Sequence, residues 1–81
     1  MSAARRLGAP VPAAVRADRH GLPLAVDGEG VESIQEEWIV EDLWWAGKPL
    51  RRRYFELVLN GGRNLVVFWD LEGEAWYAQR A

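Results

Sequence analysis

The chain of 81 residues contains no cysteine and no threonine, only two serines, and a single histidine and a single lysine. Without cysteine it has no disulfide, no thiolate nucleophile and no cysteine-based zinc site. The shortage of hydroxyl groups and imidazole leaves few candidates for nucleophilic or general acid–base chemistry. The sequence therefore favours a non-enzymatic protein that has neither a metal nor a cofactor.

Long apolar runs are missing as well. Residues 1–10 carry two arginines but no apolar run of signal-peptide length, and no segment approaches a membrane span. The formal net charge is −2, so the chain lacks the overall basic field of a typical nucleic-acid binder. We expect a cytoplasmic protein that does not associate with membranes.

Tryptophan, by contrast, is abundant. The five tryptophans all lie after residue 37, at Trp38, Trp44, Trp45, Trp69 and Trp76. Each can bury roughly 150–250 Å², so a few of them can hold together a domain that is too small for a conventional core. Self-association is a further way to stabilise so short a chain, and a homo-oligomer is therefore one possible state.

Three segments near the C-terminus have the composition of strands: residues 51–59, 64–70 and 74–79. The links between them, residues 60–63 and 71–74, contain glycine where a tight hairpin needs a positive φ. These features predict two consecutive antiparallel hairpins.

Cross-strand matching predicts the register of both hairpins. If the first turn centres on Gly61-Gly62, Phe55 lies opposite Phe68, Tyr54 opposite Trp69, and Arg53 opposite Asp70. If the second centres on Glu72-Gly73, Trp69 lies opposite Trp76, and Phe68 opposite Tyr77. The expected aromatic rows are Tyr54–Trp69–Trp76 on one face and Phe55–Phe68–Tyr77 on the other. Apolar residues on both faces suggest a sheet that curls or is covered on both sides.

The first half of the chain is less regular. Residues 13–18 and 23–26 flank a turn that contains Gly21, which predicts a hairpin, and residues 27–30 predict a second turn. Residues 31–42 fit a strand, which we favour for their β-branched and aromatic content, but their spacing also fits a helix.

These elements predict an all-β fold. We expect residues 1–11 to form a flexible N-terminal arm, and residues 12–81 a single small domain. Within it, an antiparallel sheet of about five or six strands would curl into a half-barrel.

A resemblance runs from Trp38 to Tyr77 and, with the opening hairpin that contains Arg16 and residues 24–26, covers about three-quarters of the chain. Residues 38–45 read W-I-V-E-D-L-W-W, residues 51–55 read R-R-R-Y-F, and residues 74–77 read E-A-W-Y. This pattern resembles the C-terminal segment of ImuB-type proteins, which are inactive relatives of Y-family polymerases in bacterial mutagenic repair. It also resembles small bacterial proteins that share this segment. The polymerase-like body has no counterpart here, so no polymerase or clamp-binding role carries over. The resemblance implies an accessory module in DNA damage tolerance that binds a protein, such as a translesion-repair component, or DNA.

The strongest candidate surface combines aromatic and basic residues: Trp44, Trp45, Lys48, Arg51, Arg52 and Arg53. Neighbouring strand residues point to opposite faces, so one of the two adjacent tryptophans is expected to lie outside a single core. An exposed tryptophan beside arginines can anchor a protein partner, or can stack on a base of single-stranded nucleic acid while the arginines bind phosphates. The alternative is structural: both tryptophans cap the fold, and the arginines pair with the acidic residues of positions 36–42.

Two further features receive structural interpretations. The acidic pairs Glu36-Glu37 and Glu41-Asp42 could suggest a metal site, but alternation separates the carboxylates, so we expect a solvated strand edge that resists aggregation. His20 lies in the first turn, where we expect it to be exposed rather than catalytic.

Overall fold

The computed structural model describes residues 8–42 and 50–80. Within this part of the chain there are seven strands: β1 (Val11–Pro12), β2 (Val15–Ala17), β3 (Pro23–Val26), β4 (Glu29–Asp42), β5 (Leu50–Leu59), β6 (Asn64–Asp70) and β7 (Ala75–Gln79). All pairings are antiparallel, in the order β1-β7-β6-β5-β4-β3-β2. The all-β, antiparallel class is thus confirmed. The described residues contain no helix that could cross a membrane.

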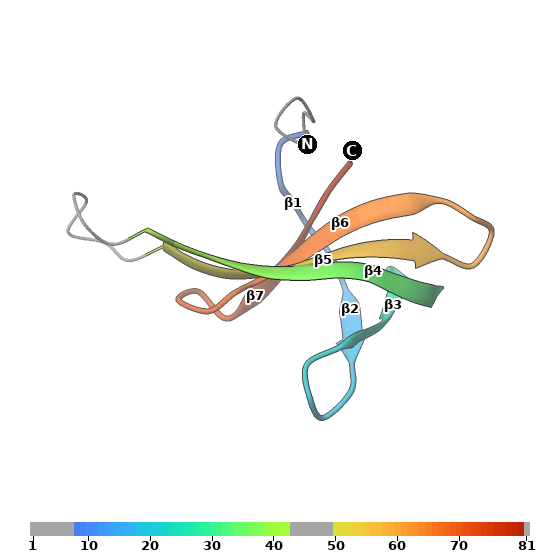
Figure 1. Ribbon diagram of the computed structural model, residues 1–81, viewed down its shortest axis with the longest axis horizontal. Helices are drawn as coiled ribbons and strands as arrows, with labels where there is room; N and C mark the ends of the chain where they lie inside the picture. The colour runs from blue at the N-terminus through green and yellow to red at the C-terminus, as the bar shows by residue number, and fades with distance from the viewer. Residues whose placement is uncertain (1–7, 43–49, 81) are drawn as a thin grey trace.

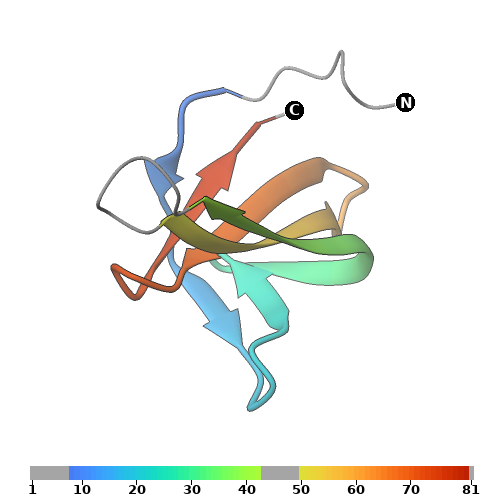
Figure 2. The same ribbon diagram turned by 60° about the vertical axis from the view of Figure 1, so that its left-hand side comes forward.

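The sheet curls because one short stretch of chain forms the strands at both edges of the sheet. In β1, Val11 lies opposite Ala78 of β7, whereas in β2, four residues later, Val15 lies opposite Val26 of β3. Residues 11–17 therefore connect the two margins, and the sheet forms a half-barrel around one face (Figure 1, Figure 2).

The sheet begins earlier in the chain than we expected. The Gly8 N–H donates to the Arg80 carbonyl over 2.9 Å, and Val11 pairs with Ala78. Residues 8–11 thus lie along β7, where the sequence predicted the last part of a flexible arm. Residues 1–7 lie outside the described part of the chain.

Both N-terminal turns are present. The first is stabilised by a hydrogen bond of 2.9 Å from Gly21 N–H to the Asp18 carbonyl, and Gly21 has the expected positive φ of 81°. In the second, Asp27 and Gly28 both have positive φ, 49° and 86°, as a two-residue hairpin turn requires. Since Glu29 already pairs with Val26, this turn is shorter than the predicted residues 27–30.

The ambiguous segment is a strand, and its helix-like spacing has a structural cause. The β4–β5 register shifts between Val31 and Ser33 and again between Ile34 and Glu36. Each shift inserts one extra residue into β4, as a β-bulge does. Val31 and Ile34 can then both pack on the core of the curl although they are three positions apart, a spacing that a regular strand would not allow.

The predicted register is right for one of the two C-terminal hairpins and wrong for the other. In the β6–β7 hairpin Trp69 lies opposite Trp76, which confirms the prediction. In the β5–β6 hairpin Tyr54 lies opposite Phe68 and Arg53 opposite Trp69, one residue away from the predicted pairs.

The cause of this difference is the length of the turn. The Leu59 N–H donates to the Arg63 carbonyl over 2.8 Å, so three residues form the loop, of which Gly61 and Gly62 have positive φ of 104° and 87°. The predicted register assumed a two-residue loop.

The one-residue shift rearranges both aromatic rows. On the outer face, adjacent rings lie about 5 Å apart in the row Trp38–Tyr54–Phe68–Tyr77, with centroid distances of 5.2, 4.9 and 5.2 Å. On the inner face, Trp76 contacts both Phe55 and Trp69. The predicted rows Tyr54–Trp69–Trp76 and Phe55–Phe68–Tyr77 are therefore wrong, although apolar residues do occupy both faces.

Each face has its own buried cluster. The inner cluster consists of Val26, Phe55, Leu57, Leu59, Leu65, Val67 and Ala78, and the outer one of Tyr54, Val66 and Phe68. The inner cluster lies inside the curl, where the β2–β3 hairpin packs on it. Inner-face residues that this hairpin does not cover can line an open surface.

Candidate functional site

One line of residues crosses the inner face of the sheet from β4 to β7. The register sets Ile39 opposite Arg53, Arg53 opposite Trp69, and Trp69 opposite Trp76. We call these four residues the Ile39–Trp76 row. Because all four share one face and one level of the sheet, they form a continuous strip of side chains.

A groove lies along the tryptophan end of this row. It has a volume of about 340 Å³ and is lined by Ala17, Gly21, Arg53, Trp69, Leu71 and Trp76. The two indole rings lie 5.4 Å apart between centroids and are tilted by 55°. Both are half-buried, so each packs on the domain with part of its surface and leaves the rest open to the groove.

Arg53 forms the polar wall of the groove and connects three elements. Its Nε donates to the Glu37 carboxylate over 2.6 Å, and its Nη1 donates to the His20 carbonyl over 3.1 Å. The guanidinium also lies 4.9 Å from the centre of the Phe55 ring. The guanidinium also lies close to Gly21, where a Cβ would be 2.8 Å from Nη1. Arg53 thus holds the tip of the β2–β3 hairpin against β4 and β5.

The other two arginines of the predicted basic surface have partners of their own. Arg51 forms a solvent-exposed ion pair of 3.0 Å with Glu41. Arg52 belongs to the outer face, where its guanidinium covers the Phe68 ring at 4.5 Å and donates to the Tyr54 hydroxyl over 3.2 Å. Alternation along β5 therefore divides the three arginines between two faces, and the structure does not bring them into one patch.

The remaining predicted site residues, Trp44, Trp45 and Lys48, lie outside the described residues. The ion pairs of Arg51 and Arg53 match the structural alternative, in which the arginines neutralise the acidic residues of β4. His20 is exposed, as expected. Over residues 8–42 and 50–80, no three His, Cys, Asp or Glu side chains are grouped so that they could hold a metal ion.

Asp18 stabilises the hairpin tip that Arg53 contacts. One carboxylate oxygen accepts hydrogen bonds from the N–H groups of Leu22, over 3.0 Å, and His20, over 2.8 Å. The bond from Leu22 is the main reason why the pKa of Asp18 lies below its ordinary value of 3.8, and the bond from His20 and the positive charges of His20 and Arg53 act in the same direction. The ionised form of Asp18 is thus the one that holds the tip.

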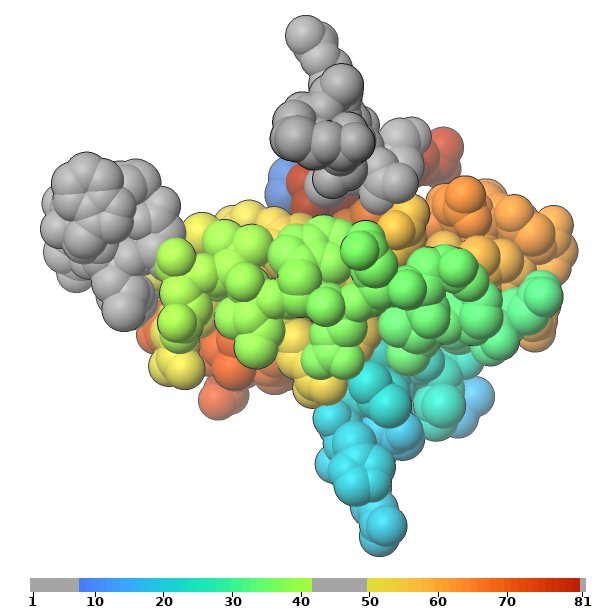
Figure 3. All heavy atoms as spheres, in the orientation of Figure 1, coloured from blue at the N-terminus to red at the C-terminus, as the bar shows by residue number. Residues whose placement is uncertain are grey.

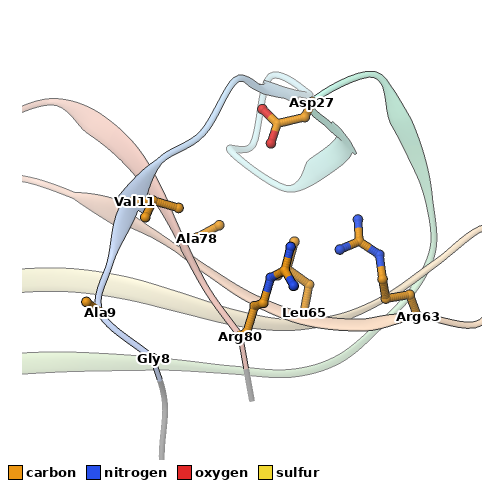
Figure 4. Close-up of a pocket in the computed structure, with 8 residues that line it drawn as sticks. All are labelled: Gly8, Ala9, Val11, Asp27, Arg63, Leu65, Ala78 and Arg80. Carbon is orange, nitrogen blue, oxygen red and sulfur yellow. The ribbon is translucent and has the colours of Figure 1, made fainter.

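A second cavity, of about 220 Å³, lies at the other end of the half-barrel (Figure 4). Its floor is formed by Leu65 and Ala78, and the guanidinium groups of Arg63 and Arg80 point into the space above them. Asp27 lies on the opposite wall, and Arg63 is paired with Glu29 over 2.8 Å. The described residues that line this cavity thus combine two basic groups with one acidic group, and none of them is aromatic.

The sequence identified Trp69 and Trp76 as neighbours but treated them as core residues. It missed the groove because the opposite wall, Ala17 and Gly21, comes from a hairpin distant in sequence. The signal that was available is Leu71, an apolar residue in a turn directly after Trp69. Comparison of the chain with protein-family models, curated proteins and solved structures finds no match.

Proposed function

We propose that this domain is a non-enzymatic interaction module that binds a protein partner through the tryptophan groove. The observation that carries the proposal is the pair of half-buried indoles, Trp69 and Trp76, beside Arg53 and the exposed Leu71. Tryptophan and arginine dominate the binding energy of protein interfaces, because each offers a large contact area together with a polar group.

The contacts that hold the side chains of the groove support the same proposal. Trp69 and Trp76 extend from paired strands, and Arg53 is fixed by contacts to Glu37 and His20. Side chains that are already ordered lose little conformational entropy when a partner binds, so a small groove can still give useful affinity. With the resemblance to the ImuB C-terminal segment, the proposed partner is a component of bacterial translesion repair.

Nucleic-acid binding has weaker support. Arg51 and Arg53 are each paired with a glutamate, and Arg52 lies on the opposite face. A single-stranded nucleic acid would have to compete with these carboxylates for each guanidinium. The net charge of −2 also repels the phosphates of a nucleic acid.

The test of the protein-binding role uses two leucines of matched exposure. Leu71 lines the groove and is 39% exposed, whereas Leu24 lies on β3 outside the groove and is 41% exposed. We expect the wild-type domain to bind a purified translesion-repair protein, Leu71→Glu to weaken this binding by about tenfold or more, and Leu24→Glu to leave it unchanged.

The proposal is wrong if no purified translesion-repair component binds, or if the two variants lose binding equally. A titration with a single-stranded oligonucleotide addresses the nucleic-acid alternative. Quenching of tryptophan fluorescence that weakens steeply with salt would favour that alternative.

A further inference from the structure

The outer edge of β4 is the longest unpaired strand edge in the described residues. On one side β4 pairs with β5 from Val31 to Asp42, but on the other side it pairs with β3 only at Glu29 and Gly30. No described element lies in front of the rest of β4 (Figure 1, Figure 3). Every second residue of such an edge directs its N–H and C=O groups away from the sheet.

Only part of this edge is suited to pairing. The two register shifts lie between Val31 and Glu36, and bulges of this kind disrupt a regular ladder. From Glu36 to Asp42 the pairing with β5 is continuous, with one partner for each residue. We call residues 36–42 the β4 edge.

The side chains of this edge combine an apolar centre with acidic flanks. Glu37, Ile39 and Glu41 lie on the inner face, since they pair with Phe55, Arg53 and Arg51. Ile39 is 62% exposed, the highest value among the large apolar residues of the described chain. Glu37 and Glu41 lie two positions to either side of Ile39, at the spacing that alternate residues of an added strand would match.

We propose that the β4 edge binds an extended segment of a partner protein, which adds to the sheet as a further antiparallel strand and has the pattern basic-x-apolar-x-basic. Its main-chain groups would pair with those of the edge. The apolar residue would lie against Ile39 and lengthen the Ile39–Trp76 row. The basic residues would lie opposite Glu37 and Glu41, each of which already has an arginine from β5 on its other side.

The same charges argue against a second copy of the chain at this edge. An antiparallel pair of copies centred on Ile39 would set Glu37 opposite Glu41 of the second copy, and an in-register parallel pair would set each glutamate opposite its own counterpart. Like charges directly opposite one another destabilise a strand pair. A basic strand is therefore the occupant whose charge complements this edge.

This inference rests on the proposed function only in that the partner is a protein. The groove and the β4 edge share the Ile39–Trp76 row but are lined by different residues otherwise. Glu41 does not line the groove, so a variant at position 41 tests the edge without changing the groove.

The test uses the peptide Thr-Lys-Thr-Val-Thr-Lys-Thr and the full chain at low salt. We expect saturable binding, with amide hydrogen exchange slowed at alternate residues of the β4 edge. Glu41→Lys should weaken binding about fivefold or more, since one attraction becomes a repulsion. Glu72→Lys changes the net charge equally but lies in the turn at residues 71–74, and should leave binding unchanged.

Three results would overturn the proposal. One is the absence of binding at millimolar peptide. Another is equal binding of a peptide methylated on alternate backbone nitrogens, which cannot form the ladder. The third is that, without peptide, amide hydrogen exchange at the β4 edge slows as the protein concentration rises, which would indicate that a second copy of the chain binds there. In each case the Leu71→Glu and Leu24→Glu comparison still decides the role of the groove.

Discussion

Asp18 couples the stability of the domain to acid pH. Its pKa in the folded protein is lowered chiefly by the hydrogen bond from Leu22 N–H, whereas the unfolded chain has the ordinary value. The unfolded state therefore binds a proton more readily, so the stabilising contribution of Asp18 is present above about pH 4 and is lost as the pH falls through the folded pKa.

The corresponding variant is Asp18→Asn, in which the side-chain oxygen can still accept a hydrogen bond but carries no charge. We expect the melting temperature of the wild type to fall more steeply below about pH 4 than that of the variant. Thermal melts followed by tryptophan fluorescence between neutral pH and pH 3 measure the difference. Parallel curves for the two proteins would contradict this role of Asp18.

Arg53 and Arg51 are two arginines of one strand with different structural roles. Arg53 bonds to Glu37 and to the His20 carbonyl, whereas Arg51 has one exposed ion pair, with Glu41. A lysine cannot reproduce the forked geometry of a guanidinium. We expect Arg53→Lys to lower the free energy of unfolding by about 1–2 kcal/mol, and Arg51→Lys to change it by less than about 0.5 kcal/mol.

Hydrogen exchange at Gly21 separates this explanation from a general loss of stability. The Gly21 N–H bonds to Asp18 within the hairpin tip that Arg53 holds. Arg53→Lys should speed exchange at Gly21 more than at the centre of β6. Equal acceleration at both places would show that Arg53 does not hold the tip specifically.

The β5–β6 hairpin depends on its three-residue loop. Gly62 has a φ of 87° and nothing within 4 Å of a Cβ built on it, so any strain from a side chain there comes from the backbone alone. We expect Gly62→Ala to destabilise the domain by about 1–2 kcal/mol. Gly62→Asn should be milder, because asparagine tolerates a positive φ, and urea unfolding measures both. Equal losses for the two variants would point to a cause other than φ.

This loop also shows what could be read from the sequence. The β6–β7 register follows from residues in that segment alone, and its prediction was right. The β5–β6 register depends on whether the loop has two or three residues, a choice that alternation of side chains does not make. In β4, bulges after Val31 and Ile34 imitate helical spacing, which left strand and helix both open. The groove was not predictable in the same way, because the wall formed by Ala17 and Gly21 is far in sequence from Trp69 and Trp76.

The presence of a buried cluster on each face means that the sheet cannot be described as one core and one solvated side. Val66 and Val67 are adjacent in β6, point to opposite faces, and are 1% and 0% exposed. We expect Val66→Ala and Val67→Ala each to lower the free energy of unfolding by about 2 kcal/mol. Val11→Ala, at the exposed margin of the sheet, should have little effect. A loss confined to Val67→Ala would show that the outer cluster adds little stability.

The groove and the β4 edge both depend on the alignment of Ile39, Arg53, Trp69 and Trp76 across four strands. That alignment and the outer aromatic row follow from the same β5–β6 register, which ring contacts report directly. Nuclear Overhauser effects between aromatic side chains are therefore the most direct test. The structure predicts contacts between the rings of Tyr54 and Phe68, 4.9 Å apart, and of Trp69 and Trp76, 5.4 Å apart. Contacts of Phe68 with Phe55 instead would place Arg53 opposite Asp70, and the row and the groove it forms would not exist.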